Sequence, residues 1–287
     1  IAMADTISLA GWSLHRRFRR DQDPLTLLEY PQVVKDEFGI TAVELNSPFF
    51  ASTDDAYLDQ LVEASKRAGV VLTGMAVDGT GDPASLDEDE RRQSVERILP
   101  WFRVSKRLGL PVFRVNTGGY GNEFNPRAVE QCIKSFRTLV KEAEETGVKL
   151  VIENHGGISI NPLNTKQIIE EIDSPMLGTL PDFGNFPDSQ KPKGLEKLQE
   201  LAGGIEADEV RYWGLEIMAP YALSVHAKMY TFDADGEEPS IDIGRCVRIM
   251  RDAGYAGYWG IEYEGKDDDH EGVLKSKALL EKHLGLS

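Results

Sequence analysis

The chain has 287 residues, 41% of them hydrophobic, so it is long enough to form a sizeable core in one large domain or two smaller ones. Its 48 Asp and Glu residues outnumber its 32 Lys and Arg residues, which gives a formal net charge of −16 at pH 7. Binding to nucleic acid or to an anionic membrane depends on Lys and Arg, so this charge argues against both kinds of partner.

Short β-branched segments alternate with longer amphipathic segments along the whole chain, without a linker between them. Eight segments have the composition of strands, at residues 6–12, 41–46, 70–77, 112–117, 149–155, 177–183, 222–229 and 258–264. Eight segments have helical periodicity, at residues 24–38, 54–68, 87–108, 126–146, 164–172, 194–202, 241–253 and 272–284. A short extra helix is expected within residues 206–219.

Glycines mark the ends of the predicted helices. A left-handed residue commonly ends a helix, and glycine suits it because it lacks a Cβ atom. Five predicted helices are followed by such a residue, at Gly39, Gly69, Gly109, Gly147 and Gly254. The recurrence of helix, glycine and strand is typical of a βα repeat.

Eight strand-helix units predict an α/β protein with a single (β/α)8 TIM barrel over residues 1–287. An open doubly wound sheet is the alternative, but its GxGxxG motif is absent after the first strand, where residues 10–13 are Ala-Gly-Trp-Ser. In a barrel, the active site lies at the C-terminal ends of the strands. We therefore expect the functional residues at those ends.

The strand ends supply two groups of candidate residues. The first, second and fourth strands offer residues that we expect to contact a substrate, namely Trp12, Glu44, Asn46, Arg114 and Asn116. The last four strands offer mainly charged residues, namely Glu153 with His155, Asp182, His226 with Lys228, and Glu262 with Glu264. Residues two apart in a strand share a face, so each of these pairs is expected on one side of its strand.

A metal site explains the acidic residues best. Carboxylates in otherwise apolar strands are costly to bury unless they are paired or coordinated. Glu153, Asp182, His226 and Glu262 form a mostly oxygen donor set, which suits a hard divalent cation. We predict one such ion, Mn²⁺ first, with Mg²⁺, Co²⁺ or Zn²⁺ as alternatives. Salt bridges to Arg114 or Lys228 are the other interpretation.

Four segments carry a family resemblance: Leu-Val-Ile-Glu-Asn-His-Gly-Gly at 150–157, Asp-Phe-Gly-Asn at 182–185, Val-His-Ala-Lys at 225–228, and the glycine- and tyrosine-rich segment 254–265. Together they resemble the xylose-isomerase-like TIM-barrel superfamily. Within it, the chain is most similar to the sugar phosphate isomerase/epimerase family, which includes ketose 3-epimerases and inosose dehydratases. The resemblance implies one divalent metal held by a Glu, an Asp, a His and a Glu, which match Glu153, Asp182, His226 and Glu262.

The chain departs from the ketose 3-epimerases around this set. They usually carry a His where this chain has Asn185 and a second Glu where it has Ser159. They also carry an Arg a few residues after the metal His, where this chain has residues 230–232, Tyr-Thr-Phe. Asn185 is therefore expected to face the substrate in a different way. No phosphate site is predicted.

These observations predict a metal-dependent sugar isomerase or epimerase that acts on a keto-sugar or polyol. A carboxylate removes the proton next to the carbonyl, and the metal stabilises the resulting enediolate. Glu153 and Glu262 are the candidate acid and base, with His155 and Lys228 as helpers. Loss of a β-hydroxyl from the same enediolate is the alternative, and it would make the protein a dehydratase, a kind of lyase.

Two other classes of function are weighed against this one. A non-catalytic sugar-binding barrel would stack Trp12 and Tyr120 on a sugar ring. A metal-dependent endonuclease, also known in the superfamily, disagrees with the acidic charge and with the small number of His residues.

We expect a small carbohydrate or polyol as the substrate. Assembly of the chain into a homo-oligomer is compatible with the sequence. No apolar run approaches the roughly 20 residues of a membrane-spanning helix. We expect a cytoplasmic protein, with a removed export signal as the alternative.

Overall fold

Eight parallel strands form one sheet in the computed structural model, which describes residues 5–286 of the chain. The strands are β1 (Thr6–Ala10), β2 (Ala42–Asn46), β3 (Val71–Val77), β4 (Val112–Val115), β5 (Lys149–Glu153), β6 (Leu177–Leu180), β7 (His226–Met229) and β8 (Tyr258–Tyr263). Each lies within a segment that the sequence predicts as a strand.

The α-helices lie between and after the strands. They are α1 (His15–Phe18), α2 (Tyr30–Phe38), α3 (Asp55–Ala68), α4 (Glu88–Ile98), α5 (Pro100–Leu108), α6 (Pro126–Thr146), α7 (Pro162–Ile172), α8 (Leu195–Leu201), α9 (Val210–Met218), α10 (Ile243–Asp252) and α11 (Asp269–Leu284). Short 3-10 helices are η1 (Gly11–Leu14), η2 (Ser47–Phe49), η3 (Gly157–Ile160), η4 (Ala207–Glu209) and η5 (Ala219–Tyr221).

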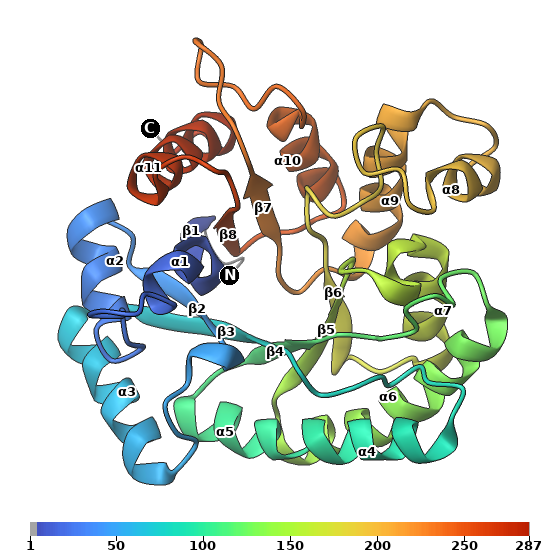
Figure 1. The fold of residues 1–287 in the computed structure, drawn as a ribbon, viewed down its shortest axis with the longest axis horizontal. Helices are drawn as coiled ribbons and strands as arrows, with labels where there is room; N and C mark the ends of the chain where they lie inside the picture. The colour runs from blue at the N-terminus through green and yellow to red at the C-terminus, as the bar shows by residue number, and fades with distance from the viewer. Residues whose placement is uncertain (1–4, 287) are drawn as a thin grey trace.

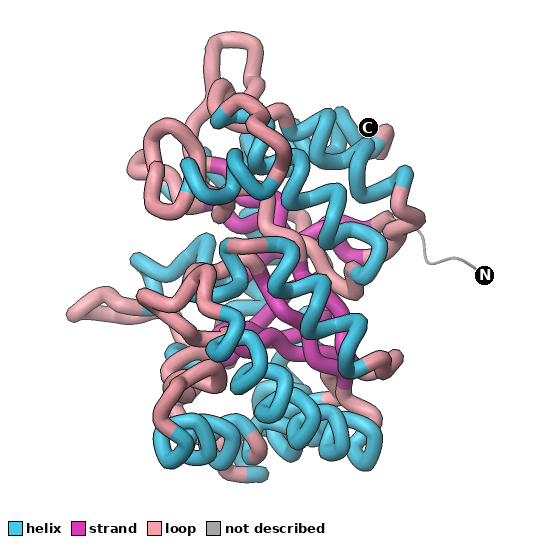
Figure 2. Tube along the Cα trace, turned by 90° about the vertical axis from the view of Figure 1, so that its right-hand side faces the viewer, coloured by secondary structure: helices cyan, strands magenta, loops and turns pink. Residues whose placement is uncertain are grey.

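The sheet closes into a barrel. Its strands pair in the order β6-β5-β4-β3-β2-β1-β8-β7, and the two edge strands meet through isolated parallel bridges at Thr179–Ala222 and Asp182–His226. The backbone N–H of His226 donates to the carbonyl of Pro181 at 3.1 Å. The larger helices surround the strands (Figure 1), and several loops project together on one side of the molecule (Figure 2). This arrangement confirms the predicted (β/α)8 barrel.

Strand alternation divides the apolar residues from the polar ones. In β8, Trp259, Ile261 and Tyr263 are buried in the main hydrophobic core with the surrounding helices. Glu262, between two of them, faces the barrel interior instead. A small apolar cluster of Val112, Val151 and Leu180 also lies in the barrel. Each of these three stands two residues before a polar residue of the candidate site, namely Arg114, Glu153 and Asp182.

The structure corrects three predicted boundaries. The segment 87–108 is two helices rather than one, because Pro100 lacks the N–H that a continuous helix would use and begins α5 instead. The first strand ends at Ala10, and the helix predicted from residue 24 begins at Tyr30. The expected extra helix within 206–219 is confirmed as α9.

The predicted glycine C-caps are confirmed, because Gly39, Gly69, Gly109 and Gly147 each adopt the left-handed conformation directly after a helix. Gly254 also has a positive φ, one residue after the cap of α10. Within residues 5–286, no helix combines the length and the apolar composition that crossing a bilayer requires.

Candidate metal centre

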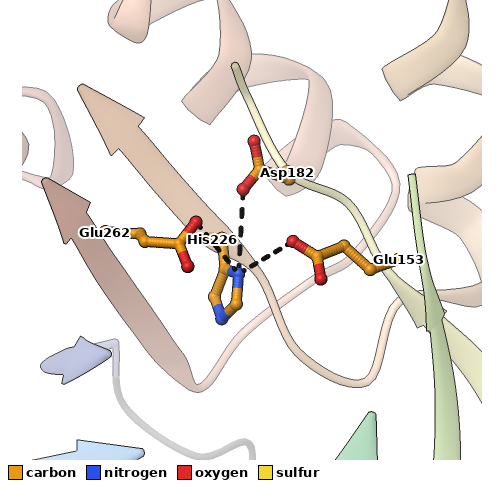
Figure 3. Close-up of side chains that lie close together, drawn as sticks. All are labelled: Glu153, Asp182, His226 and Glu262. Atoms are coloured by element: carbon orange, nitrogen blue, oxygen red, sulfur yellow. Dashed lines mark hydrogen bonds and ion pairs between the residues drawn. The ribbon is translucent and has the colours of Figure 1, made fainter. Parts of the chain in front are cut away.

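Four of the predicted side chains meet inside the barrel mouth, and we call Glu153, Asp182, His226 and Glu262 the ligand cluster. One possible ligand atom from each residue lies within 4.8 Å of those of the other three, and all four residues are buried. The His226 Nδ1 atom is 3.2 Å from Glu153 Oε1, 3.6 Å from Glu262 Oε2 and 3.7 Å from Asp182 Oδ2. Figure 3 shows the three carboxylates pointing toward this nitrogen from different sides.

Two carboxylate oxygens of the ligand cluster indicate whether a cation fits there, because they lack hydrogen bonds within residues 5–286. Asp182 Oδ2 and Glu262 Oε2 are buried, and neither accepts a hydrogen bond from any residue in the described part of the chain. A buried carboxylate oxygen without a hydrogen bond is costly. The Lys228 ammonium offsets part of this cost from 3.0 Å (Glu262) and 3.5 Å (Asp182), and a divalent cation between the two oxygens would offset more of it. Three carboxylates and one imidazole are suitable donors for such an ion. The residues therefore fit a divalent metal.

Asp182 lies beyond the end of β6, and the neighbouring strand holds it in place. Its backbone N–H donates to Asn154 Oδ1 at 2.8 Å, and Asn154 Nδ2 donates back to the Asp182 carbonyl at 2.9 Å. The N–H of Gly184 donates to Asp182 Oδ1 at 2.7 Å. One carboxylate oxygen is thus fixed by the backbone, and the other is left facing the ligand cluster.

Lys228 lies beside the ligand cluster and is almost fully buried. Its Nζ is 3.0 Å from Glu262 Oε2 and 3.5 Å from Asp182 Oδ2. It also lies 3.2 Å from Glu264 Oε1. Burial would lower the pKa of Lys228, but these three carboxylates raise it well above the ordinary value of a lysine. Lys228 therefore stays charged.

Asn185 occupies one of the positions where the sequence departs from the ketose 3-epimerases, and it contacts both Lys228 and Glu153. Its Oδ1 accepts a hydrogen bond from Lys228 Nζ at 2.8 Å, and its Nδ2 donates to Glu153 Oε1 at 3.3 Å. The residue therefore bridges the ammonium group and one carboxylate of the ligand cluster.

Arg114 supports the opposite side of Glu153. Its Nε lies 2.9 Å from Glu153 Oε2, and its Nη1 lies 2.6 Å from Asp78 Oδ1. Asn116 completes the group, because it accepts a hydrogen bond from Arg114 at 2.9 Å and donates one to Asp78 at 3.0 Å. Asp78 was not predicted as a site residue, although it directly follows β3 and therefore stands at a strand end like the residues that were predicted.

The two Glu residues of the ligand cluster have different proton affinities. Burial raises the pKa of both side chains. Arg114 and His226 nevertheless hold the pKa of Glu153 well below its usual value. Burial dominates for Glu262, whose pKa is raised although Lys228 and His226 oppose the shift. Without metal, Glu153 is therefore the better candidate base and Glu262 the better candidate acid.

The stability of the metal-free protein is expected to fall as pH rises above 6.5. Burial lowers the pKa of His226, but Glu44, Glu262 and the other nearby carboxylates raise it well above its ordinary value of 6.5. Between 6.5 and the folded-state pKa, the folded chain binds more protons than the unfolded one. Unfolding free energy should therefore fall by up to about 1.4 kcal/mol per pH unit. Urea denaturation in EDTA at several pH values measures this slope, and His226→Gln should flatten it; an equally steep slope in that variant would contradict the assignment.

Above the ligand cluster lies a pocket of about 210 Å³, which we call the mouth pocket. Its lining comprises Trp12, Arg19, Asn46, Pro48, Asp78, Arg114, His155, Glu262 and Glu264. Six of the candidate residues predicted at the strand ends thus line this pocket. Trp12 packs against Phe49 with their ring centroids 6.0 Å apart, and the Arg19 guanidinium lies 4.6 Å above the Trp12 ring.

Glu44 is placed differently from the other predicted substrate contacts. It does not line the mouth pocket but lies behind His226, with its Oε1 2.9 Å from His226 Nε2. It faces a second cavity of about 380 Å³, the basal cavity, whose lining includes Ser8, Val112, Val225 and Tyr258. Tyr120, the other proposed stacking residue, is 57% exposed and does not line the mouth pocket either.

A family model described as "Xylose isomerase-like TIM barrel" matches residues 33–283. Among curated proteins, the "3'-dehydrocarminate deglycosidase alpha subunit" of a Microbacterium species is 24% identical, and the match covers 82% of each chain. The "C-glycoside deglycosidase alpha subunit" of Arthrobacter globiformis is 26% identical, with coverage of 74% of this chain and 70% of that one. Among solved structures, "Structure of L-ribulose 3-epimerase" has a TM-score of 0.74 at 14% identity, covering 99% of this chain and 95% of the other. At that identity the structural likeness shows a shared fold.

Proposed function

Because the chain belongs to the xylose isomerase-like TIM-barrel family, we propose that it is a divalent-metal-dependent enzyme that removes a proton next to the carbonyl of a keto-sugar or keto-polyol. The enzyme names of its sequence relatives indicate that the chain is an enzyme. The observation that carries the reaction type is the ligand cluster, where Glu153 and Glu262 are buried within one small group yet have their pKa values shifted in opposite directions.

The side chains of the site have different roles in proton transfer. Glu153, kept ionised by Arg114, takes the proton from carbon, and Glu262 returns a proton to the resulting enediolate. A divalent ion bound by the ligand cluster would supply Lewis acidity toward the developing negative charge on oxygen. The ammonium group of Lys228 adds hydrogen-bond donors beside that charge, and His155 at the pocket edge exchanges protons with solvent. Return of the proton to the opposite face gives epimerisation, and its return to the neighbouring carbon gives isomerisation.

Elimination is a second candidate for the fate of the enediolate. The name of one relative denotes a sugar oxidised at its 3' carbon and the loss of its aglycone. In a 3-keto sugar, removal of the proton on carbon 2 allows the substituent on carbon 1 to leave, because that substituent is β to the carbonyl. Asn185 and Ser159, which stand where ketose 3-epimerases usually carry His and Glu, support this outcome over epimerisation.

A single experiment separates these fates. The metal-free chain is incubated in D₂O with a methyl or an aryl 3-keto-glucoside, with and without added Mn²⁺, and the products are followed by NMR and mass spectrometry. We expect Mn²⁺-dependent deuterium incorporation next to the carbonyl and a loss of turnover in EDTA. An inverted but intact glycoside identifies an epimerase, whereas release of the aglycone identifies a lyase.

Absence of both exchange and product with Mn²⁺, Mg²⁺, Co²⁺ and Zn²⁺ would contradict the proposal and favour the non-catalytic sugar-binding barrel. If turnover occurs, the relative activity with each metal also tests our expectation of Mn²⁺.

The proposal extends to assembly and location. The relatives are named alpha subunits, which supports an assembly of more than one chain, either copies of this chain or a second kind of subunit. We place the enzyme in carbohydrate metabolism in the cytoplasm, with a small carbohydrate as its substrate. Size-exclusion chromatography with light scattering measures whether purified chains associate.

A further inference from the structure

The two ring nitrogens of His226 face different surroundings. Nδ1 faces the three carboxylates of the ligand cluster, while the other nitrogen points away from them (Figure 3). That nitrogen, Nε2, lies 2.9 Å from Glu44 Oε1. The side chains of His226 and Glu44 are 2% and 11% exposed, so the contact is almost entirely shielded from water. It joins β7 to β2, which are not neighbours in the sheet.

A neutral imidazole carries its hydrogen on one nitrogen and a lone pair on the other. A carboxylate beside Nε2 accepts the hydrogen there and leaves the lone pair of Nδ1 facing the ligand cluster. Carboxylate partners of this kind orient the ring of a ligating histidine and increase its basicity. We propose that Glu44 is a positioning residue that fixes the tautomer and orientation of His226 for metal binding.

Glu44 acts from the side opposite the substrate. It lines the basal cavity together with Ser8, and it is not among the residues that line the mouth pocket. A group in that place can orient the imidazole without touching a molecule in the mouth pocket. The assignment therefore replaces the expected substrate contact at Glu44, and it rests on the proposed metal site.

Metal affinity tests the inference without reference to activity. The full chain, stripped of metal with EDTA and dialysed, is titrated with Mn²⁺ by isothermal calorimetry and by EPR of the free ion. Glu44→Leu removes the acceptor and is expected to weaken Mn²⁺ binding about 10–100-fold, the usual cost of losing such a partner. Glu44→Gln keeps the volume and one acceptor oxygen, so it should recover part of this loss without reaching wild-type affinity. Ser8→Ala, which changes another residue of the same cavity and leaves the Glu44 carboxylate in place, should bind as the wild type does.

The graded order of the two Glu44 variants distinguishes positioning from packing. A role in packing alone would leave Glu44→Gln at wild-type affinity, which would overturn the inference, as would a loss in Ser8→Ala equal to that in Glu44→Leu. If Glu44→Leu does not unfold cooperatively, it is not properly folded and its metal affinity is not used. The inference is then tested by comparing the Mn²⁺ affinity of Glu44→Gln with that of the wild type. Failure of the wild type to bind any divalent ion would remove the proposed metal site, whereas normal binding by wild type and both Glu44 variants would remove only the role of Glu44.

Discussion

Glu153→Gln is expected to lower kcat/KM for the keto-sugar reaction by about 10²–10⁴-fold, the usual contribution of a positioned base. Gln has nearly the same shape as Glu, but it cannot accept a proton from carbon. It retains an oxygen that faces Arg114, so the fold should persist. Steady-state kinetics at saturating Mn²⁺, with circular dichroism and thermal unfolding on the same samples, measure both parts of the prediction.

Two variants define the specificity of that effect. Glu145→Gln removes an exposed carboxylate from the last turn of α6, which precedes the N-terminal end of β5, and should leave turnover unchanged. Glu262→Gln should also be severely impaired, because it removes the carboxylate assigned to return the proton. Deuterium exchange without product in Glu262→Gln would separate the two roles. Full activity in Glu153→Gln would refute the assignment of the base.

Lys228→Met is expected to destabilise the metal-free protein by about 3–5 kcal/mol, the range for breaking a buried ion pair by removing one partner. Asp182 and Glu262 would then be buried without the ammonium group that lies 3.5 and 3.0 Å from their oxygens. Mn²⁺ should restore much of the loss, because it supplies positive charge at the same carboxylates. Urea denaturation with EDTA, and again with excess Mn²⁺, measures the two free energies of unfolding.

An exposed lysine serves as the matched control. Lys166→Met removes a surface ion pair with Glu170 one helical turn away, and such pairs contribute only about 0–1 kcal/mol. The two substitutions are chemically identical, so the difference between them isolates burial beside the ligand cluster. Equal stability of wild type and Lys228→Met in EDTA would show that the buried ammonium does not compensate these acids.

The residues of the ligand cluster could be predicted because the barrel fold determines where the ends of its strands lie. Parallel strands in a closed sheet bring their C-terminal ends to one mouth, so a charged residue at the end of an apolar strand already indicates where its side chain goes. Glu153 and Glu262 follow buried apolar residues of β5 and β8 in this way. Alternation along each strand then selects the inward side, which places Lys228 on the same side as His226.

The depth of each side chain in the barrel could not be predicted. Glu44 and Asn46 share a face of β2, yet Asn46 lines the mouth pocket and Glu44 lies behind His226. That depth depends on the tilt and stagger of neighbouring strands, which are properties of the closed sheet and not of any one segment. Pro100 is a local signal for the division of residues 87–108 into two helices. A single helix was predicted because the helical periodicity continues across this proline.

The closure of the barrel has a further consequence. Among the described strands, β6 and β7 are the neighbours joined by isolated bridges instead of a continuous ladder, and one bridge pairs Asp182 with His226. Both residues belong to the ligand cluster, so an ion that they share would cross-link the two edges of the sheet where their backbone pairing is sparsest. Release of that ion would then favour local opening between β6 and β7, and slower amide hydrogen exchange along this seam would accompany metal binding.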